Sequence, residues 1–358
     1  MNLTRRSVLA GTAGAITTGA LAGCLDDVAS DAEGSAGSGY AAFFTLWDWS
    51  EQVAGDELSF ENPVPAGTMG HGFEPSSEVL TEIADSDVFV YLDTSEFSWA
   101  QEAADRLEAD YPDVVVVDGL DGIDLLEWDH DHDDDHGDDH HDDDHGDDHH
   151  DDDHGDDHHD DDHGDDHHDD DHDDHDHDHG EYDPHVWVDP VRAQRIVDNI
   201  ADGLADADPD NEETFRDNAE AYNDRLEDLH GEFEDLFANA DRDVIVVAGH
   251  DSYQYLEDRY GFEVHTPVGV SPHDEPSQDD IAETIDLVDE HGIDTILYDH
   301  FESPTLAETI VENSDATETL AITPAEGTTD EWAEEGWGYL EQMEEINLSA
   351  FEQAVGSQ

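Results

Sequence analysis

Lysine is absent from this chain of 358 residues, and its nine basic residues are all arginine. Aspartate and glutamate together number 102, which leaves a formal net charge of −93. Nucleic-acid binding needs clustered lysine or arginine against the phosphates, so the composition argues against a nucleic-acid partner. Charge of this size destabilises a compact fold by self-repulsion, and concentrated salt screens that repulsion. We therefore infer a salt-loving source.

Cysteine is nearly absent too, since Cys24 is the only one, and no long apolar run occurs. Without a second cysteine no internal disulfide can form, so stability must come from packing. Residues 4–9 read TRRSVL, a twin-arginine export pattern, and the stretch after it is too short and too rich in Gly and Thr to favour a membrane span. Residues 21–24, LAGC, resemble a lipobox. We expect residues 1–24 to be a twin-arginine lipoprotein signal that ends at a lipidated Cys24; the alternative is a buried structural cysteine.

Histidine, by contrast, is concentrated in residues 129–180, which hold 18 of the 26 histidines together with 29 aspartates. A nonapeptide, HGDDHHDDD, recurs in register there. With no apolar side chain the segment cannot build a core, so we expect a disordered loop. Imidazole beside carboxylate suits divalent transition metals, whereas an insertion that merely adds charge would not need histidine. We expect accessory metal binding by His136, His140, His141, His145, His149, His150, His154, His158, His159, His163, His167 and His168.

The remaining chain has the organisation of an α/β protein. Small polar residues predict a flexible tether over 25–39. Short apolar runs predict buried parallel strands at 43–46, 88–92, 114–117, 244–248 and 295–298. Apolar residues at three- and four-residue spacing predict one long helix over about 211–239. We expect two lobes, each a parallel sheet flanked by helices: an N-terminal lobe (40–190), a helical linker with the long backbone helix (191–240) and a C-terminal lobe (241–358). A coiled coil is the weaker alternative, because no heptad is sustained.

Three histidines outside the His/Asp segment stand at or near the ends of predicted strands, where α/β sheets bind ligands. His71 lies in a loop after a short strand at 58–60. His185 lies in residues 183–190, DPHVWVDP, whose prolines restrict the backbone on both sides of it. His250 follows the strand at 244–248, and we expect it to begin a helix.

The surroundings of these histidines resemble the zinc-uptake (ZnuA-like) family of metal-binding, ABC-transporter solute-binding proteins, from about Tyr40 onward. In that family the motif GxDPHxxEPS supplies a first ligand, DPHxWxDP a second, and a histidine at a strand end before an aromatic-rich helix a third. The resemblance implies His71, His185 and His250 as the metal ligands. It also implies a His/Asp/Glu-rich loop immediately before the second motif, which is where residues 129–180 stand.

The sequence departs from the family pattern in two places. Met69 and Gly70 replace the Asp-Pro that precedes the first ligand, and Thr323 stands where many relatives have a late aspartate ligand. The fourth ligand is therefore Glu326, Asp299 or water. Manganese relatives carry glutamate in place of the third histidine, so His250 favours zinc.

The resemblance implies an extracytoplasmic, lipid-anchored protein that captures Zn²⁺ between two lobes and delivers it to an ABC-transporter membrane permease. We expect export by the twin-arginine route, anchoring to the outer face of the cell membrane through Cys24, and a monomer. An enzyme is disfavoured, because a metallohydrolase needs a general base and no HExxH segment is present. Two alternatives stay open: a metal buffer or store that acts through the His/Asp-rich loop, and a manganese-type binding protein.

Overall fold

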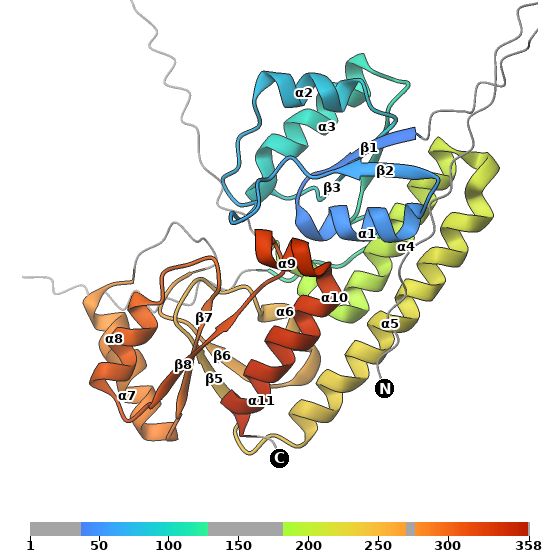
Figure 1. Cartoon of the computed structure of the whole chain (residues 1–358). Helices are drawn as coiled ribbons and strands as arrows, with labels where there is room; N and C mark the ends of the chain where they lie inside the picture. Colours follow the sequence, from blue (N-terminus) through green and yellow to red (C-terminus); the bar gives the residue numbers. More distant parts are fainter. Residues whose placement is uncertain (1–36, 128–181, 270–275, 357–358) are drawn as a thin grey trace, which may run out of the picture. The chain divides into compact units, whose positions relative to one another are not determined.

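The computed structural model describes residues 37–127, 182–269 and 276–356 (Figure 1). The predicted leader, Cys24 and the twelve histidines expected to bind accessory metal lie outside the described residues. The described part contains two four-stranded parallel sheets with the same strand order, β2-β1-β3-β4 and β6-β5-β7-β8. This confirms the predicted α/β fold with two parallel sheets flanked by helices.

The first sheet consists of β1 (Gly37–Ala41), β2 (Leu58–Glu61), β3 (Val88–Tyr91) and β4 (Val115–Asp118). Helices α2 (Ser77–Ala84) and α3 (Ser98–Asp110) cover one face, and α1 (Phe44–Ala54) and α4 (Pro190–Ala207) cover the other (Figure 1). Every residue of β3 is buried, as expected for a central parallel strand with helices on both faces.

Two predictions at the start of this lobe are wrong. The expected strand at 43–46 is the first turn of α1, and the strand lies earlier, at β1. A short buried apolar run does not distinguish a strand from a helix, which explains the error. The predicted tether is too long, because Gly37 pairs with Leu58 and Gly39 with Phe60. Gly39 reads as linker but is needed in the sheet, since a Cβ there would lie 2.2 Å from the Phe60 ring.

The second sheet consists of β5 (Val244–Val247), β6 (Glu263–His265), β7 (Thr295–Asp299) and β8 (Glu318–Ile322). Alternate residues of β5 face opposite sides, as the strand period requires. Val244 and Val246 join a core with α7 (Gln278–His291) and α8 (Thr305–Asn313), whereas Ile245 and Val247 face the main core.

His250 does not begin a helix, so that expectation is wrong. Helix α6 (Gln254–Tyr260) starts four residues later. The intervening turn is held by the backbone N–H of Tyr253, which donates to Asp251 Oδ1 at 3.1 Å, and by the backbone N–H of Asp251, which donates to Gly269 O at 3.0 Å. These bonds keep His250 in a loop at the end of β5.

Helix α5 (Glu212–Ala238) confirms the predicted long helix, with 27 residues. At 1.5 Å per residue it is about 40 Å long. Its buried stripe packs against α1 and α4 of the first lobe, and toward its other end Phe233 lies 6.2 Å from Phe351 of α11 (Ser349–Val355) and 5.5 Å from Tyr260 of α6. The stripe consists of Phe215, Ala219, Tyr222, Leu226, Leu229 and Phe233.

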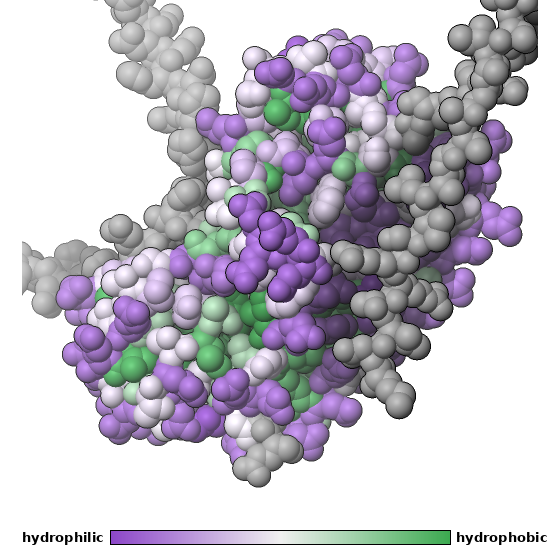
Figure 2. Space-filling view, viewed as in Figure 1, coloured by the Kyte–Doolittle hydropathy of each residue, from purple (hydrophilic) through white to green (hydrophobic). Residues whose placement is uncertain are grey.

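The C-terminal segment returns to the first lobe through α9 (Asp330–Glu335) and α10 (Tyr339–Gln342), which a π-helical turn (Met343–Leu348) connects to α11. The backbone N–H of Tyr339 donates to Asp48 Oδ2 at 2.9 Å, and its hydroxyl donates to Trp187 O at 2.8 Å. The visible face of the described residues is largely hydrophilic (Figure 2), in keeping with the acidic composition. In the part of the chain that the structure describes, no helix is both long and apolar enough to cross a bilayer.

Candidate metal centre

The candidate ligands lie beyond the carboxyl ends of parallel strands. His71 is in the loop after β2, His250 follows β5, Asp299 ends β7 and Glu326 follows β8. His185 precedes the short 3-10 helix η2 (Val186–Val188). Open α/β sheets bind ligands at this edge, because the loops there converge where the strand order reverses.

Three of these side chains form one buried group. The candidate ligand atoms of His71, His185 and Glu326 all lie within 4.8 Å of one another. The two imidazole rings are nearly parallel, with centroids 5.1 Å apart, and Glu326 Oε1 lies 2.5 Å from His71 Nδ1. Within the described residues, His71 Nε2, His185 Nε2 and Glu326 Oε2 are buried without a hydrogen-bond partner. Buried polar atoms are normally paired, so this set of lone pairs has the chemistry of a divalent-metal site.

A carboxylate orients His185. Asp183 Oδ1 lies 2.7 Å from His185 Nδ1 and also accepts the backbone N–H of His185 at 2.9 Å. When Nδ1–H donates its hydrogen bond to Asp183, the lone pair lies on Nε2, which becomes the ligand nitrogen, as is usual for metal-binding histidines. Burial lowers the pKa of His185 well below its ordinary value, and nearby His71 and His250 lower it further. The ring therefore stays neutral, which is the state that binds metal.

His250 lies beside this group without belonging to it. Its ring centroid is 5.9 Å from that of His71 and 5.5 Å from that of His185. Both ring nitrogens are engaged, Nδ1 with Glu302 Oε1 at 2.6 Å and Nε2 with Ser252 Oγ at 2.7 Å. Burial lowers the pKa of His250, but the Glu302 hydrogen bond and the nearby acidic groups outweigh it, so the pKa is raised.

Of the two carboxylates considered for the fourth position, Glu326 joins the group and Asp299 does not. Asp299 is buried, its Oδ1 accepts the backbone N–H of Phe301 at 2.8 Å, and burial raises its pKa to about 7. Burial raises the pKa of Glu326 as well, but the electrostatic attraction and hydrogen bond of His71, together with the attraction of nearby His250, outweigh it, so the net shift is downward. Glu326 is therefore the carboxylate poised to be ionised within the group.

The loop that carries Glu326 (residues 323–329, the Glu326 loop) follows β8 of the second lobe and is held by side chains of the first lobe. Ala325 O accepts the Thr45 hydroxyl, and Pro324 O accepts Trp187 Nε1–H at 2.7 Å. Ala325 has a φ of 56°, a value rare for a residue other than glycine and often found at functional sites. The Thr323 hydroxyl accepts the Ala325 N–H at 2.9 Å, so the residue at the expected aspartate shapes the loop.

Sequence reasoning did not identify the partners of the histidines. Asp183 was visible within the second motif, two residues before His185. Glu302 lies 52 residues from His250 in sequence and carries no local signal. Ser252 is close to His250 in sequence, but its role depends on the turn that follows β5.

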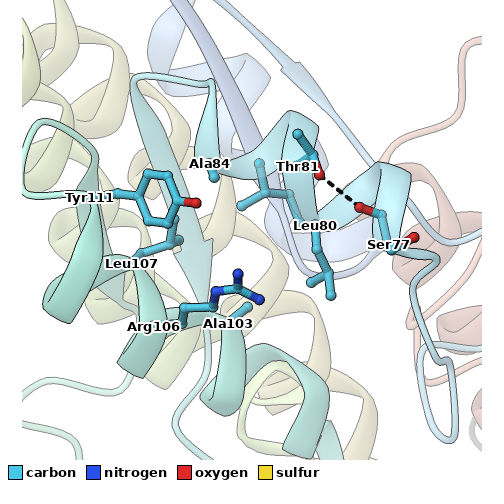
Figure 3. Close-up of a pocket in the computed structure, with 9 residues that line it drawn as sticks. Ser77, Leu80, Thr81, Ala84, Ala103, Arg106, Leu107 and Tyr111 are labelled. Atoms are coloured by element: carbon cyan, nitrogen blue, oxygen red, sulfur yellow. Dashed lines mark hydrogen bonds between the residues drawn. The ribbon is translucent and has the colours of Figure 1, made fainter.

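A separate cavity of about 180 Å³ lies between α2 and α3, with the Arg106 and Tyr111 side chains at one end (Figure 3). It shares no lining residue with the His71 group, so it is not the candidate metal centre. Its wall is mostly apolar and consists of Ser77, Leu80, Thr81, Ile83, Ala84, Ala103, Arg106, Leu107 and Tyr111.

Comparison with known proteins gives a consistent result. The family described as "Zinc-uptake complex component A periplasmic" matches residues 40–354. The chain is 30% identical over 317 residues to the zinc-binding lipoprotein AdcA of Streptococcus pneumoniae, with 87% of this chain and 54% of AdcA covered. It is 26% identical over 313 residues to the high-affinity zinc uptake system protein ZnuA of Bacillus subtilis, with 87% of this chain and 86% of ZnuA covered.

Among solved structures, the Zn(II)-bound ZnuA-like domain of Streptococcus pneumoniae AdcA is similar, with a TM-score of 0.66 and 27% identity, covering 90% of this chain and 99% of that domain. The chain spans about half the length of AdcA, with which it shares this domain. The family match extends from β1 to α11 and includes His71, His185, His250 and Glu326. The chain belongs to the zinc-uptake complex component A family.

Proposed function

We propose that the chain is a solute-binding protein that captures Zn²⁺ with His71, His185 and Glu326 and completes the coordination sphere with His250. The observation that carries the proposal is the convergence of three buried ligand groups within 4.8 Å. Three imidazole nitrogens and one carboxylate oxygen make an ordinary tetrahedral zinc site. A manganese-type protein is the weaker candidate, because Mn²⁺ prefers oxygen-rich, six-coordinate sites. The zinc-binding relatives support the same assignment.

His250 closes the site last in this proposal. In the described structure its Nε2 bonds to Ser252 while Glu302 holds Nδ1. Exchanging the Ser252 hydroxyl for the ion requires only that the ring shift, since the His250 ring centroid already lies within 6 Å of the other two. Because His250 comes from the second lobe and His71 from the first, bound zinc then joins the two lobes.

We further propose that the protein is exported by the twin-arginine route, anchored to the outer face of the cell membrane through lipidated Cys24, and delivers zinc as a monomer to an ABC permease. The TRRSVL and LAGC segments support export and anchoring. The family match to a component of a zinc-uptake complex supports a permease partner, and one matched relative is named a lipoprotein. The His/Asp segment at 129–180 would raise the local zinc concentration near the site.

A metal buffer is the second candidate, favoured by the 18 histidines of residues 129–180. The two functions differ in what survives removal of this segment. Its removal is practicable, because Glu127 pairs with Tyr182 in an isolated bridge and the Asp183 N–H donates to Leu126 O at 3.0 Å. A short linker can therefore replace residues 129–179. A zinc receptor keeps one tight site after the deletion, whereas a buffer loses most of its useful binding.

The test is a zinc titration of the full chain and of the shortened chain at neutral pH and high salt. We expect one tight site in both proteins and its loss when His71, His185 and His250 are replaced together by alanine. The matched control replaces three described histidines outside the site, His230, His265 and His300, and should keep the tight site. A shortened chain without a tight site would overturn the receptor function in favour of the buffer.

A further inference from the structure

An aromatic wall (Phe43, Phe97 and Trp187) stands behind the candidate metal centre. All three side chains are fully buried. Phe43 stacks on Phe97 with centroids 4.8 Å apart and lies 4.8 Å from Trp187, and the Phe97 and Trp187 rings are 5.9 Å apart. The three rings therefore form one packed unit.

The aromatic wall contacts each of the three grouped ligands or its loop. Phe97 lies 5.3 Å from the His71 ring, and Trp187 lies 5.3 Å from the His185 ring. Trp187 Nε1–H donates to Pro324 O at 2.7 Å, two residues before Glu326. The orientation of His71, His185 and the loop of Glu326 therefore depends on how these three rings pack.

Gly70 shows how tightly the aromatic wall closes on the site. A Cβ at this position would lie 3.0 Å from Phe43 Cβ, 3.0 Å from the Phe97 ring and 3.2 Å from Glu326 Oε1. These distances are shorter than ordinary van der Waals contacts, so a side chain here would push the wall and Glu326 apart. This is one of the two positions where the sequence departs from the family's first motif, and the glycine matches the space that the two phenylalanines leave.

We infer that the aromatic wall determines the metal preference of the centre by holding the coordination number at four. The inference rests on the proposed function. Four ligands in a tetrahedron satisfy zinc, whereas Mn²⁺ prefers six ligands, most of them oxygen. At this centre Mn²⁺ would therefore need water molecules as additional ligands. The buried rings pack against His71 and His185, so they take up space that added water would need on the first-lobe side, and they keep the imidazoles from moving apart.

The test replaces Phe97 with alanine and, as a milder variant that retains apolar volume, with leucine. Phe89→Ala is the matched control, because Phe89 is an equally buried phenylalanine of the same lobe that packs on Tyr91 and Trp99 rather than on a ligand. The full chain receives sub-stoichiometric Co²⁺, so that its tightest site fills first. Four-coordinate Co²⁺ absorbs visible light much more strongly than six-coordinate Co²⁺. Competition titrations then give the zinc-to-manganese affinity ratio.

We expect the intense Co²⁺ bands in the unmutated chain and in Phe89→Ala, and weakened bands in Phe97→Ala. The zinc-to-manganese affinity ratio should fall by roughly 10–100-fold in Phe97→Ala, the range found for residues that support metal ligands. Phe97→Leu should show a smaller change of the same sign, and it decides the matter if the alanine variant does not fold. Unchanged bands and an unchanged ratio would overturn the inference and leave the zinc site intact. No tight site in the unmutated chain would overturn the proposed function as well.

Discussion

At the scale of single residues, two histidines near the metal centre share one arrangement. Asp183 holds Nδ1 of His185 at 2.7 Å, and Glu302 holds Nδ1 of His250 at 2.6 Å. A carboxylate at Nδ1 fixes the tautomer and directs Nε2 toward the ion. The two histidines differ in whether Nε2 is free to bind a metal. His185 Nε2 has no hydrogen-bond partner among the described residues, whereas His250 Nε2 bonds to Ser252. Under the proposed function, His185 already presents a free ligand nitrogen before zinc binds, whereas His250 must first release Ser252.

Glu302→Ala should weaken zinc binding by roughly 10–100-fold, because His250 loses the group that orients it. The measurement is zinc affinity by competition with a chelator. Glu308→Ala is the control, since Glu308 is an exposed glutamate in the first turn of α8, a few residues away. Equal losses of affinity in the two variants would contradict the positioning role and point to a general effect of charge.

At the scale of elements, the Glu326 loop is built from the second lobe but fixed by neighbours from elsewhere in the chain. Thr45 of α1 donates to Ala325 O, Trp187 of η2 donates to Pro324 O, and Gln342 of α10 donates to Gly327 O at 3.1 Å. The backbone N–H of His71 also donates to Glu326 Oε1 at 2.5 Å. Glu326 is thus tied to the first lobe, where His71 and His185 lie.

Thr45→Val should lower the free energy of unfolding by about 1–3 kcal/mol, because the buried Ala325 carbonyl loses its partner while the side-chain volume is kept. Zinc affinity should fall with it, since the Glu326 loop is loosened. Thr81→Val is the control: Thr81 is exposed on α2, and its hydroxyl donates only to Ser77 O, one turn earlier (Figure 3). Denaturant unfolding and chelator competition measure the two effects. A stable Thr45→Val protein with full zinc affinity would contradict this role for α1.

The contact between α6 and β6 predicts a pH dependence. Burial raises the pKa of Glu257 to about 8, against 4.5 for the free group, and its carboxyl accepts the Val264 N–H. Because the pKa is higher in the folded state, the protonated Glu257 carboxyl stabilises the folded protein. This contribution to the free energy of unfolding is fully present below pH 4.5 and is lost as the pH rises to about 8. Over this window Glu257→Gln should lessen the fall in melting temperature of the metal-free protein. The same slope in both proteins would contradict the assignment to Glu257.

The elements also show how far sequence reasoning reaches. The apolar spacing of α5 and the buried runs of β3 and β5 were sufficient to predict them. Strand β1 was missed because Gly37 and Gly39 look like linker, although Gly39 is needed for the close approach of Phe60. The sequence did not predict that Glu326, rather than Asp299, lies beside His71 and His185, since this position depends on the positive φ of Ala325 and on hydrogen bonds from distant elements.

At the scale of the whole molecule, the excess of negative charge is the most prominent feature. Two of the nine arginines, Arg192 and Arg259, form ion pairs with the same buried carboxylate, Asp189 at the start of α4, at 2.7 and 2.6 Å. A net charge of −93 leaves most acidic groups without a basic partner. Repulsion among them must therefore be screened by the solvent.

The free energy of unfolding should rise when sodium chloride increases from about 0.1 M to about 1 M, because the screening length falls from roughly 10 Å to roughly 3 Å. Potassium chloride is the control and should give the same rise if screening is the cause. Denaturant unfolding at each salt concentration measures the free energy of unfolding. Equal stability at low and high salt would contradict the inferred need for concentrated salt.

The most direct test of the central claim is anomalous diffraction at the zinc absorption edge from crystals grown with one equivalent of zinc. We predict that the strongest anomalous peak lies between His71, His185 and Glu326, within bonding distance of these three and of His250. A strongest peak elsewhere, with the cluster of His71, His185 and Glu326 empty, would contradict the assignment of the metal centre.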